Sequence, residues 1–404
     1  MIARRSFLGL LTGSVGAAAT AAWPRPAAPH IGVVGAGIVG SSIAYHLAEA
    51  GARVTVFDKS GPAAGATRNS FAWINAFVAD THYRDMRLAS LLAYHALDRR
   101  LGLGITWGGY LNWADDPERA KLVRANAAQL AGSPYPVQWL TPADVAERSP
   151  HLEPGAVVAA IYSAIDGHID PVHATQGFLD GARRQGAQLR YPCEIQAIDF
   201  SHGRLRGVRT SQGPVALDRL VVAAGVDTPR LLAPCGYTLR LRHAPGILAH
   251  SKPLPPLTRI IHDGPGELSF KQMADGRLVG TDSPEPPDLP VHAAIRAQAV
   301  DFPDEAIREL HGNRILGKIK AVLPDARSAG LEWLSLGFRP MPLDELPIVG
   351  EVPGAPGVYM AVTHSGVTLA PILGRYATAE LLDGISVGTL APYRPGRFAQ
   401  ASPG

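Results

Sequence analysis

Residues 31–59 read IGVVGAGIVGSSIAYHLAEAGARVTVFDK, and this stretch decides the fold of the first part of the chain. The apolar residues 31–34 predict a short buried strand. Residues 41–50 predict a helix that stops at Gly51, a good C-terminal stop. Residues 53–57 form a β-branched run typical of a second strand. The order strand, glycine turn, helix and strand predicts a parallel βαβ unit.

Three glycines shape the turn between the first strand and the helix. Gly35 allows a tight turn, Gly37 lets the backbone approach a pyrophosphate, and Gly40 lets the helix lie close to the strand. Free N–H groups at the helix start favour an anion. The stretch therefore predicts a dinucleotide site formed by Gly35, Ala36, Gly37, Ile38, Val39, Gly40, Asp58 and Lys59, with Asp58 on the ribose hydroxyls. The alternative is an ordinary βαβ unit without a ligand, and the motif alone does not separate FAD from NAD.

The size and charge of the chain fit a compact enzyme. It has 404 residues, enough for two domains, with 46% hydrophobic and 18% charged residues. The formal net charge is +3, but residues 1–27 carry Arg4, Arg5 and Arg25 and no acid. Without that segment the chain is close to neutral, so the composition predicts no nucleic-acid partner.

The N-terminus, residues 1–28, has the character of a targeting segment. Arg4 and Arg5 are followed by Ser-Phe-Leu and by an uncharged run of small and apolar residues up to Ala22. This pattern resembles the twin-arginine export signal. It predicts a partner in the export machinery, cleavage between residues 20 and 30, and a periplasmic or secreted protein. A plain secretory signal or an uncleaved anchor is the alternative.

The chain shows no metal-ligand or dithiol pattern. Cys193 and Cys235 lie far apart and form no C-x-x-C pair, so two idle thiols are favoured over a disulfide. The histidines are scattered without metal-ligand spacing, which predicts no metal site.

The rest of the chain predicts alternating elements, followed by a strand-rich part. Helices are expected at 84–101, 117–132, 173–186, 291–322 and 371–383, the first with an apolar stripe of Met86, Leu88, Leu91, Leu92 and Leu97. A bent strand pair is expected at 105–113. Strands are expected at 188–200, 204–210 and 220–225, and antiparallel strands near 258–262, 267–272 and 277–281. Residues 167–171 are expected to form a turn.

These elements predict an α/β fold, α+β overall. A Rossmann-like domain is assembled from the separated segments 29–105, 155–240 and 325–404. An antiparallel-sheet substrate domain, formed by residues 106–154 and 241–324, is inserted between them.

Two later stretches carry a family resemblance. Residues 337–350 read GFRPMPLDELPIVG and residues 357–374 read GVYMAVTHSGVTLAPILG. Together with residues 31–59, DGHIDP at 166–171 and VVAAG at 221–225, they resemble the FAD-dependent D-amino-acid oxidase superfamily. This superfamily includes glycine oxidase, sarcosine oxidase and D-amino-acid dehydrogenases, and the resemblance spans about residues 30 to 385.

The resemblance implies a role for Arg339 and for the segment after it. Arg339 matches the arginine that holds the substrate carboxylate, and a guanidinium suits this task because it donates two parallel hydrogen bonds. A structural ion pair with a nearby acid, such as Asp344, is the alternative. The segment that covers the flavin ring matches Gly366, Val367, Thr368 and Leu369, which lead into a helix with Pro371 as an early position. The alternative is a simple helix cap.

Further cofactor contacts follow from the same resemblance. Family members wrap the pyrophosphate and flavin with residues that match Arg68, Asn69 and Ser70, although a polar surface turn explains these residues almost as well. Ile195 matches the strand that meets the adenine, and Ala224 and Gly225 end a strand where backbone can approach a bound group. Relatives with covalent flavin carry a cysteine near the position of Pro340 or Met341. No cysteine stands there, which implies noncovalent FAD.

The implied reaction is oxidation of a small amine or amino acid that bears a carboxylate, such as a D-amino acid, glycine or sarcosine. Hydride passes to flavin N5, the imine hydrolyses, and oxygen or a quinone accepts the electrons. His364 is a candidate base, and a histidine that is simply packed in a loop is the alternative. Thr363 and Val367 stand where many members have glycine. This departure keeps open a flavin-binding accessory or electron-transfer protein without amino-acid turnover. An oxidase of a substrate without a carboxylate is a further alternative.

Overall fold

The computed structural model describes residues 28–282 and 305–398. The expected signal segment therefore lies outside the described residues, apart from Ala28. The first part of the helix expected at 291–322 also lies outside them. Among the described residues, no helix is both long enough and apolar enough to cross a bilayer.

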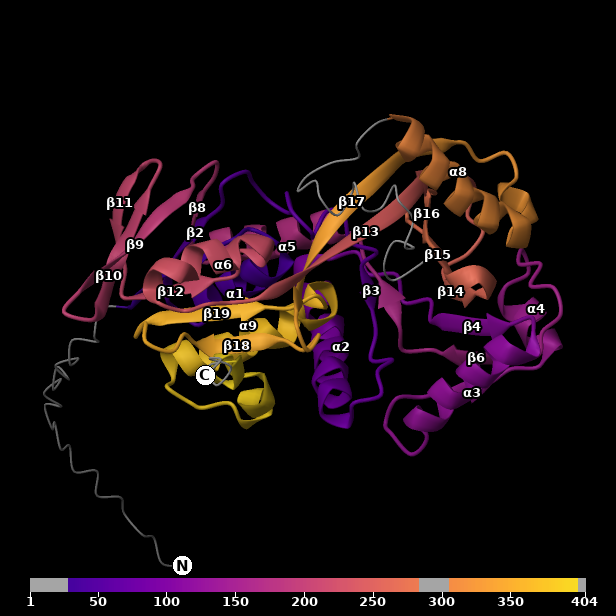
Figure 1. Cartoon of the computed structure of the whole chain (residues 1–404), viewed down its shortest axis with the longest axis horizontal. Helices are drawn as coiled ribbons and strands as arrows, with labels where there is room; N and C mark the ends of the chain where they lie inside the picture. Colours follow the sequence, from indigo (N-terminus) through magenta and orange to yellow (C-terminus); the bar gives the residue numbers. More distant parts are fainter. Residues whose placement is uncertain (1–27, 283–304, 399–404) are drawn as a thin grey trace, which may run out of the picture.

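Six strands form a mostly parallel sheet at the centre of the nucleotide-binding part (Figure 1). Their order is β18 (Ile348–Glu351), β19 (Val358–Val362), β12 (Arg219–Val222), β1 (His30–Val34), β2 (Arg53–Phe57) and β8 (Gln188–Arg190). Only β18 runs antiparallel to its neighbour β19. The carboxyl ends of β1, β2 and β12 therefore meet at one edge of the sheet, where ligands bind in folds of this kind.

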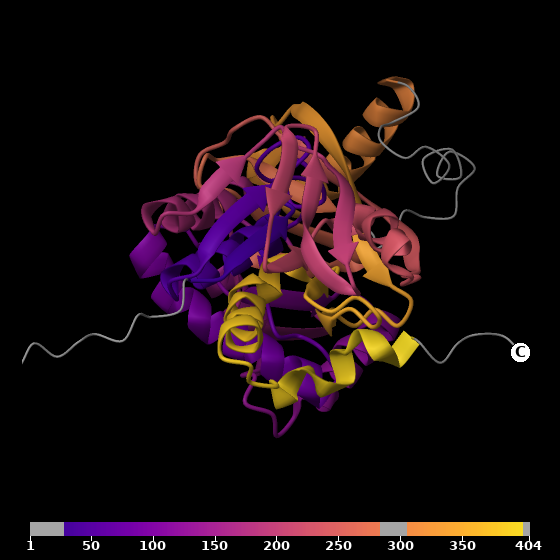
Figure 2. The ribbon, with the colours of Figure 1, turned by 90° about the vertical axis from the view of Figure 1, so that its left-hand side faces the viewer.

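Different layers cover the two faces of this sheet (Figures 1 and 2). One face packs against helices α1 (Ile38–Glu49), α5 (Pro171–Arg184), α9 (Gly366–Leu382) and α2 (Thr81–Leu101). The other face packs against a three-stranded antiparallel sheet of β9 (Ile195–Ser201), β10 (Arg204–Thr210) and β11 (Gly213–Ala216), and against α6 (Thr228–Leu232). Helix α1 is buried from Gly40 to Ala48, because it lies between the sheet, α5 and α9.

A second sheet of eight strands forms the other half of the molecule. Its order is β17 (Leu331–Pro342), β13 (Leu241–Ser251), β16 (Leu278–Thr281), β15 (Leu268–Gln272), β14 (Ile261–Gly264), β4 (Tyr110–Ala114), β6 (Ala159–Ser163) and β5 (Gln138–Trp139). All paired strands are antiparallel except β14 and β4. The predicted fold class, a Rossmann-like domain with an inserted antiparallel-sheet domain, is confirmed.

Helices cover this second sheet as well. Helix α8 (Glu305–Val322) packs Ile315 and Ile319 into one core cluster, which also holds Leu111 and Trp113 of β4. Helix α3 (Pro117–Leu130) packs on β4 and β6, whereas α4 (Pro142–Arg148) contributes Val145 to the α8 cluster. A short pair, β3 (Trp73–Ile74) and β7 (Gly167–His168), links the two halves. Side chains alternate along a strand, so Asn112 of β4 faces away from α8.

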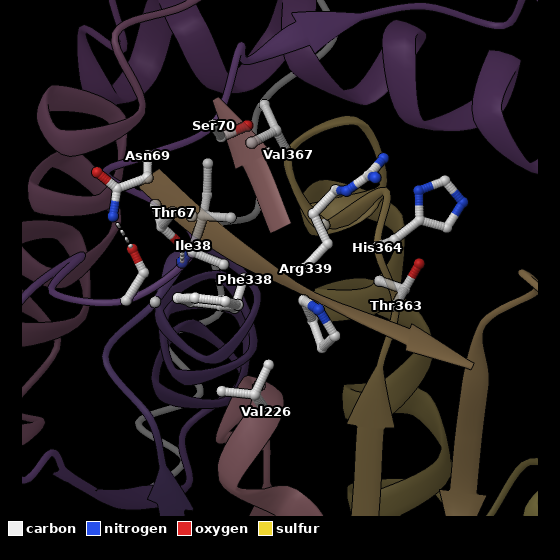
Figure 3. A pocket seen from close by; sticks show the side chains of 18 of the residues that line it. Ile38, Thr67, Asn69, Ser70, Val226, Phe338, Arg339, Thr363, His364 and Val367 are labelled. Carbon is white, nitrogen blue, oxygen red and sulfur yellow. Dashed lines mark hydrogen bonds between the residues drawn. The ribbon is translucent and has the colours of Figure 1, made fainter. Parts of the chain in front are cut away.

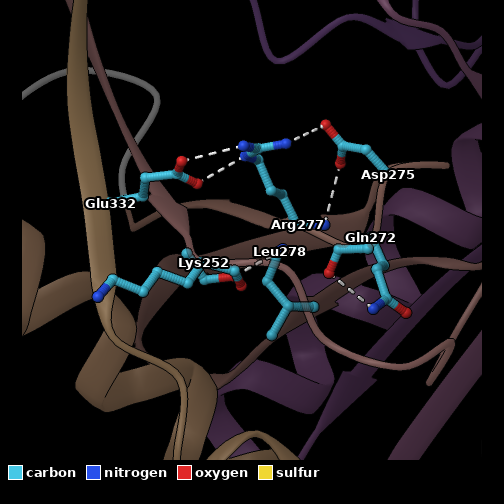
Figure 4. Close-up of polar contacts among 8 residues, drawn as sticks. Lys252, Gln272, Asp275, Arg277, Leu278 and Glu332 are labelled. Atoms are coloured by element: carbon cyan, nitrogen blue, oxygen red, sulfur yellow. Dashed lines mark hydrogen bonds and ion pairs between the residues drawn. The ribbon is translucent and has the colours of Figure 1, made fainter.

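The turn between β15 and β16 is tied to β17 by an ion-pair network (Figure 4). Arg277 donates to both carboxylate oxygens of Glu332, at 2.7 and 3.0 Å, and to Asp275 at 2.6 Å. Gln272 closes the same turn by donating to the carbonyl of Gly276 at 2.9 Å. Exposed pairs of this kind contribute little to stability, but here they fix the position of the hairpin against the long strand.

The expected elements differ from the structure at several points. Strands β6 and β17 lie in the eight-stranded sheet, although their residues were placed with the nucleotide-binding segments, because both pair with strands of the inserted part. Residues 105–113 do not form a strand pair: Thr106 makes an isolated bridge to His168, and only the residues from Tyr110 onward belong to a strand, β4. The expected strand at 188–200 is two strands, and the expected turn at 167–171 begins with β7. Helix α9 begins at Gly366, five residues before Pro371.

Candidate active site

The turn after β1 requires glycine at two of the three predicted positions. Gly35 has a φ of +107°, and a Cβ there would lie 2.3 Å from the carbonyl oxygen of Ala223. A Cβ on Gly40 would lie 2.0 Å from the carbonyl oxygen of Gly35. Both contacts are shorter than any van der Waals separation, so the turn and helix α1 can pack closely only without these side chains.

The start of helix α1 is open toward a large cavity. Gly37 is the N-cap residue and has no side chain to cap the helix, and the hydroxyl of Thr67 accepts a hydrogen bond from the N–H of Ile38 at 3.2 Å. Gly37, Ile38 and Val39 line the cavity. Ala36 and Gly40 lie just behind this surface and are buried. An anion at this helix start would meet backbone donors and the positive end of the helix dipole.

Asp58 is held firmly at the end of β2. One carboxylate oxygen accepts from the N–H of Ala36 at 2.8 Å, and the other accepts from the N–H groups of Ser60 and Gly61 at 2.8 and 2.9 Å. Asp58 lines the cavity next to Lys59, which forms an ion pair with Asp227. Because each carboxylate oxygen has more than one lone pair, Asp58 can still accept hydrogen bonds from a ribose.

An apolar slot lies at this end of the cavity. Ile195, Ala224, Gly225 and Val226 line it, and Val226 is half exposed at 50%. Glu194 and Arg230, paired at 3.1 Å, border it. A flat heteroaromatic ring such as adenine suits a slot of this composition.

In the segment after β2, the residues around Arg68 line the cavity but Arg68 itself does not. Asn69 and Ser70 line the cavity, together with Thr67 and Phe71 (Figure 3). Arg68 is exposed and does not line the cavity. The predicted role of Arg68 at the cofactor remains a prediction. Its exposed position gives that role no support.

Arg339 stands at the far end of the same cavity, on β17 opposite Ala244 of β13. Its Nε donates to the carbonyl oxygen of Ala244 at 3.4 Å, and the residue is partly buried. Asp344, the partner of the alternative ion pair, instead binds Arg397 with both carboxylate oxygens, at 2.8 and 3.1 Å. This carboxylate is thus already engaged by another arginine.

His364 lies beside Arg339 in the cavity (Figure 3). Burial, together with the positive charges of Arg87 and Arg339, lowers the pKa of His364 to about 4. The imidazole is therefore neutral near pH 7, where it can orient a substrate or water but is a weak base.

Helix α9 places only part of the predicted flavin-covering segment at the cavity. Gly366 and Val367 line it, whereas Thr368 and Leu369 are buried in the helix interface. The hydroxyl of Thr368 donates to the carbonyl oxygen of Trp73 at 3.0 Å. The segment is the first turn of a helix, so its N–H groups form a positive helix end beside Arg339.

Helix α2 braces this helix start with side chains that the sequence reading missed. Arg87 donates to the hydroxyl of Ser365 at 2.5 Å, and Ser90 donates to the carbonyl oxygen of Thr368 at 2.6 Å. Tyr94 donates to the carbonyl oxygen of Val367 at 2.5 Å. These residues recur at helical spacing, which is a sequence signal. The predicted apolar stripe consisted of other residues of this helix, and one of them, Leu92, is 73% exposed.

Another residue that the sequence reading missed is Lys271 of β15, which is 1% exposed. Its Nζ has no hydrogen-bond partner within the described part of the chain. It lies 5.2 Å from the centre of the Phe71 ring, which lines the cavity. Burial lowers the pKa of Lys271 to about 7. A lysine in a short strand that also carries large apolar residues, LSFKQ, is the signal that could have found it.

The cavity as a whole measures about 1110 Å³. This exceeds the roughly 300–1000 Å³ typical of a pocket for one drug-sized ligand. It runs from the adenine-type slot past the glycine turn to Arg339, so the residues present fit a dinucleotide with a flavin at the far end. In the residues described, no group of histidine, cysteine and acidic side chains is placed to hold a metal ion, and both cysteines are free thiols.

This arrangement is that of a dinucleotide-binding protein. The sequence signature of the family described as FAD dependent oxidoreductase matches residues 30–380, and the chain belongs to this family. It is 26% identical over 387 residues to the mitochondrial dimethylglycine dehydrogenase of Rattus norvegicus, covering 91% of this chain but 44% of that protein. The chain thus spans less than half of the dimethylglycine dehydrogenases it matches. It is 26% identical to the glycine oxidase of Geobacillus kaustophilus, covering 85% of this chain and 90% of that protein.

Solved structures agree with this fold. The crystal structure of L-proline dehydrogenase from P. horikoshii superposes with a TM-score of 0.81 at 22% identity, covering 94% of this chain and all of that one. Glycine oxidase from Geobacillus kaustophilus superposes with a TM-score of 0.79 at 24% identity, covering 93% of this chain and all of that one. At these identities the likeness concerns the fold.

Proposed function

We propose that this FAD-dependent oxidoreductase oxidises a small amine or amino acid whose carboxylate is bound by Arg339. The observation that carries the proposal is the position of Arg339, which shares one cavity with the glycine turn and with the start of α9. Relatives named as glycine oxidase and 4-methylaminobutanoate oxidase support a carboxylate-bearing amine as the substrate class.

The residues of the chain divide the work between holding the cofactor and placing the substrate. Bound FAD supplies the two-electron acceptor, and the oxidised amine leaves as an imine that water hydrolyses. The start of α1 and Asp58 would hold the diphosphate and ribose, and the start of α9 would stabilise negative charge on the flavin. Arg339 fixes the carboxylate, which aligns the C–H bond to be broken, and fixed geometry of this kind contributes several kcal/mol.

His364 has a different role from the one expected of a base. Because its pKa is lowered to about 4, it carries no charge near pH 7 and does not compete with Arg339 for the carboxylate. We assign it to orientation of the substrate or of the hydrolytic water.

The remaining parts of the proposal concern the cofactor bond, the electron acceptor and the location. Pro340 and Met341 stand where relatives with covalent flavin carry cysteine, which supports noncovalent FAD. The acceptor is oxygen or a quinone. The twin-arginine pattern at residues 4–8 supports export to the periplasm or beyond.

The experiment is an anaerobic spectral titration of the purified holoprotein with glycine, sarcosine, proline and both enantiomers of common amino acids. Bleaching of the flavin absorption band by at least one of them is the expected result. A yellow protein that no amine bleaches would contradict the proposal and favour an accessory or electron-transfer protein.

A further inference from the structure

Arg87 of helix α2 is a buried cation whose partners are all neutral. The residue is 6% exposed. Its guanidinium donates to Oδ1 of Asn75 at 2.7 Å and to the hydroxyl of Ser365, 278 positions away, at 2.5 Å, and it lies 4.7 Å from the centre of the Tyr83 ring. Its Nε has no hydrogen-bond partner, and it forms no ion pair with any residue that the structure describes. Because burying a charge without a counter-ion is costly, this arrangement indicates that the negative charge comes from a ligand.

Asp166 is the acid that the charge of Arg87 reaches, but it does not compensate that charge fully. Asp166 is completely buried, and its carboxylate accepts from Nε1 of Trp73 at 2.8 Å and from the hydroxyl of Tyr135 at 2.7 Å rather than from Arg87. Burial raises the pKa of Asp166 to about 7. Near pH 7 this acid is therefore only partly ionised, and Arg87 keeps an excess of positive charge.

The charge of Arg87 acts at the end of the cavity where helix α9 begins. Ser365 is the N-cap residue of α9 and does not cap the helix with its own side chain. Val367 lines the cavity, whereas Arg87 is not one of the lining residues and lies behind this wall (Figure 3). His364 reports the field, because after burial the charge of Arg87 lowers its pKa more than the charge of Arg339 does.

We propose that the charge of Arg87 stabilises the negative charge of reduced flavin, through the start of α9, and so raises the reduction potential of the bound FAD. The amine loses a hydride and then a proton to become an imine, and the hydride brings one negative charge to the flavin. A fixed positive charge nearby favours this reduced form. Arg87 is a positioning residue here, since it touches neither substrate nor the cavity surface. The inference rests on the part of the proposed function that places the flavin at the start of α9, and on no particular amine.

The test uses the holoprotein without an amine substrate. The potential of the bound FAD is measured by slow anaerobic reduction together with a dye of known potential. Sulfite gives a second readout, because its sulfur forms a bond to flavin N5 with its own electron pair, nothing leaves, and the flavin again gains negative charge. Acetate is the control anion, which binds without forming a bond to the flavin. The flavin spectrum gives the Kd of both anions.

Asn75→Asp cancels the charge of Arg87 with the smallest change in shape. A carboxylate at this position keeps an acceptor for Arg87 and for the N–H of Phe77. We expect the sulfite Kd to rise about tenfold and the potential to fall by about 30 mV, which is a tenfold change for a two-electron couple. A residue that only braced the helix would predict no change, because the hydrogen bonds are kept.

Arg87→Gln removes the charge instead of cancelling it and should have the same effect, whereas Arg87→Lys keeps the charge and should stay within about threefold of the parent in the sulfite Kd. Arg84→Gln is the matched control. Arg84 lies on the same helix and is 4% exposed, but it donates to the backbone carbonyls of Val78 and Ala79, at 3.1 and 3.2 Å, outside α9. This control should leave the potential and the sulfite Kd unchanged.

Several results would overturn the proposal. One is a potential and a sulfite Kd in Asn75→Asp that equal those of the parent, and this variant decides alone if Arg87→Gln does not retain FAD. Another is a loss of acetate binding equal to the loss of sulfite binding at an unchanged potential, because the charge would then serve the bound anion. None of these measurements needs an amine. Unchanged potentials in a protein that an amine bleaches would therefore remove this role of Arg87 and leave the proposed reaction standing.

Discussion

The carbonyl of Val367, at the start of helix α9, lacks its normal partner. In a helix it would accept from the N–H four residues later, but that residue is Pro371, which has no N–H. The hydroxyl of Tyr94 takes this place at 2.5 Å, and Tyr94 is fully buried. Tyr94→Phe removes the donor and leaves a buried carbonyl unpaired. The expected loss is about 1–3 kcal/mol in the free energy of unfolding.

Restoring the missing N–H should reverse much of this loss. In the Pro371→Ala background the helix can satisfy Val367 by itself, so Tyr94→Phe should cost about 1–2 kcal/mol less than in the parent. The assay is a double-mutant cycle from denaturant unfolding of the holoprotein at saturating FAD. Tyr237→Phe is the matched control, because its hydroxyl donates to the carbonyl of Pro395, at 3.0 Å, in another segment. It should show no coupling to Pro371→Ala. An equal cost of Tyr94→Phe in both backgrounds would refute this reading of the helix start.

Three further predictions follow from the cofactor site and the buried lysine. Gly35→Ala should abolish FAD retention, because the added Cβ would lie 2.3 Å from a backbone oxygen. Gly51 also has a positive φ, but a Cβ there would meet no atom within 4 Å. Gly51→Ala should therefore keep the yellow colour and lose only about 1 kcal/mol in the free energy of unfolding. Acid precipitation should release all flavin and leave colourless protein; colour retained on the protein would contradict noncovalent binding. Since the pKa of Lys271 is lowered from 10.5 to about 7, the folded chain binds fewer protons than the unfolded chain between these values, and stability should rise with pH there. Lys271→Met should therefore be more stable than the parent at pH 7, with an advantage that shrinks toward pH 10; parallel pH profiles of the two unfolding free energies would exclude this.

The parts of the fold that local sequence determines could be predicted. The glycine spacing of residues 35–40 and the β-branched run at 53–57 fix the βαβ unit, because strand, turn and helix are set by neighbours in sequence. The residues of β6 and β17 were placed with the nucleotide-binding segments, whereas they pair with strands of the eight-stranded sheet, since pairing depends on a distant partner. No local pattern shows that Arg339 lies opposite Ala244.

The candidate site likewise has residues that motifs could predict and residues that depend on distant contacts. The residues at the glycine turn, and Arg339 and His364, could be predicted from motifs, and the structure brings them to one cavity. Tyr94 contacts a residue 273 positions away, and Arg87 contacts Ser365, 278 positions away. Such contacts leave only a weak trace in the sequence, a polar residue at a position where the pattern calls for an apolar one. Arg68 was predicted from its position in a motif, but that position does not determine where its side chain lies, and the residue is exposed.

The role of Arg339 as the carboxylate anchor can be measured by comparing an amino acid that bleaches the flavin with the amine that lacks its carboxylate, in the parent and in Arg339→Met. Two charge-assisted hydrogen bonds of about 1.5–3 kcal/mol each predict a loss of roughly 10²- to 10⁴-fold in kcat/KM for the amino acid and little change for the amine. If Arg339→Met retains yellow flavin and oxidises the amino acid as efficiently as the parent, the substrate carboxylate is bound elsewhere and the proposed orientation of the substrate is wrong.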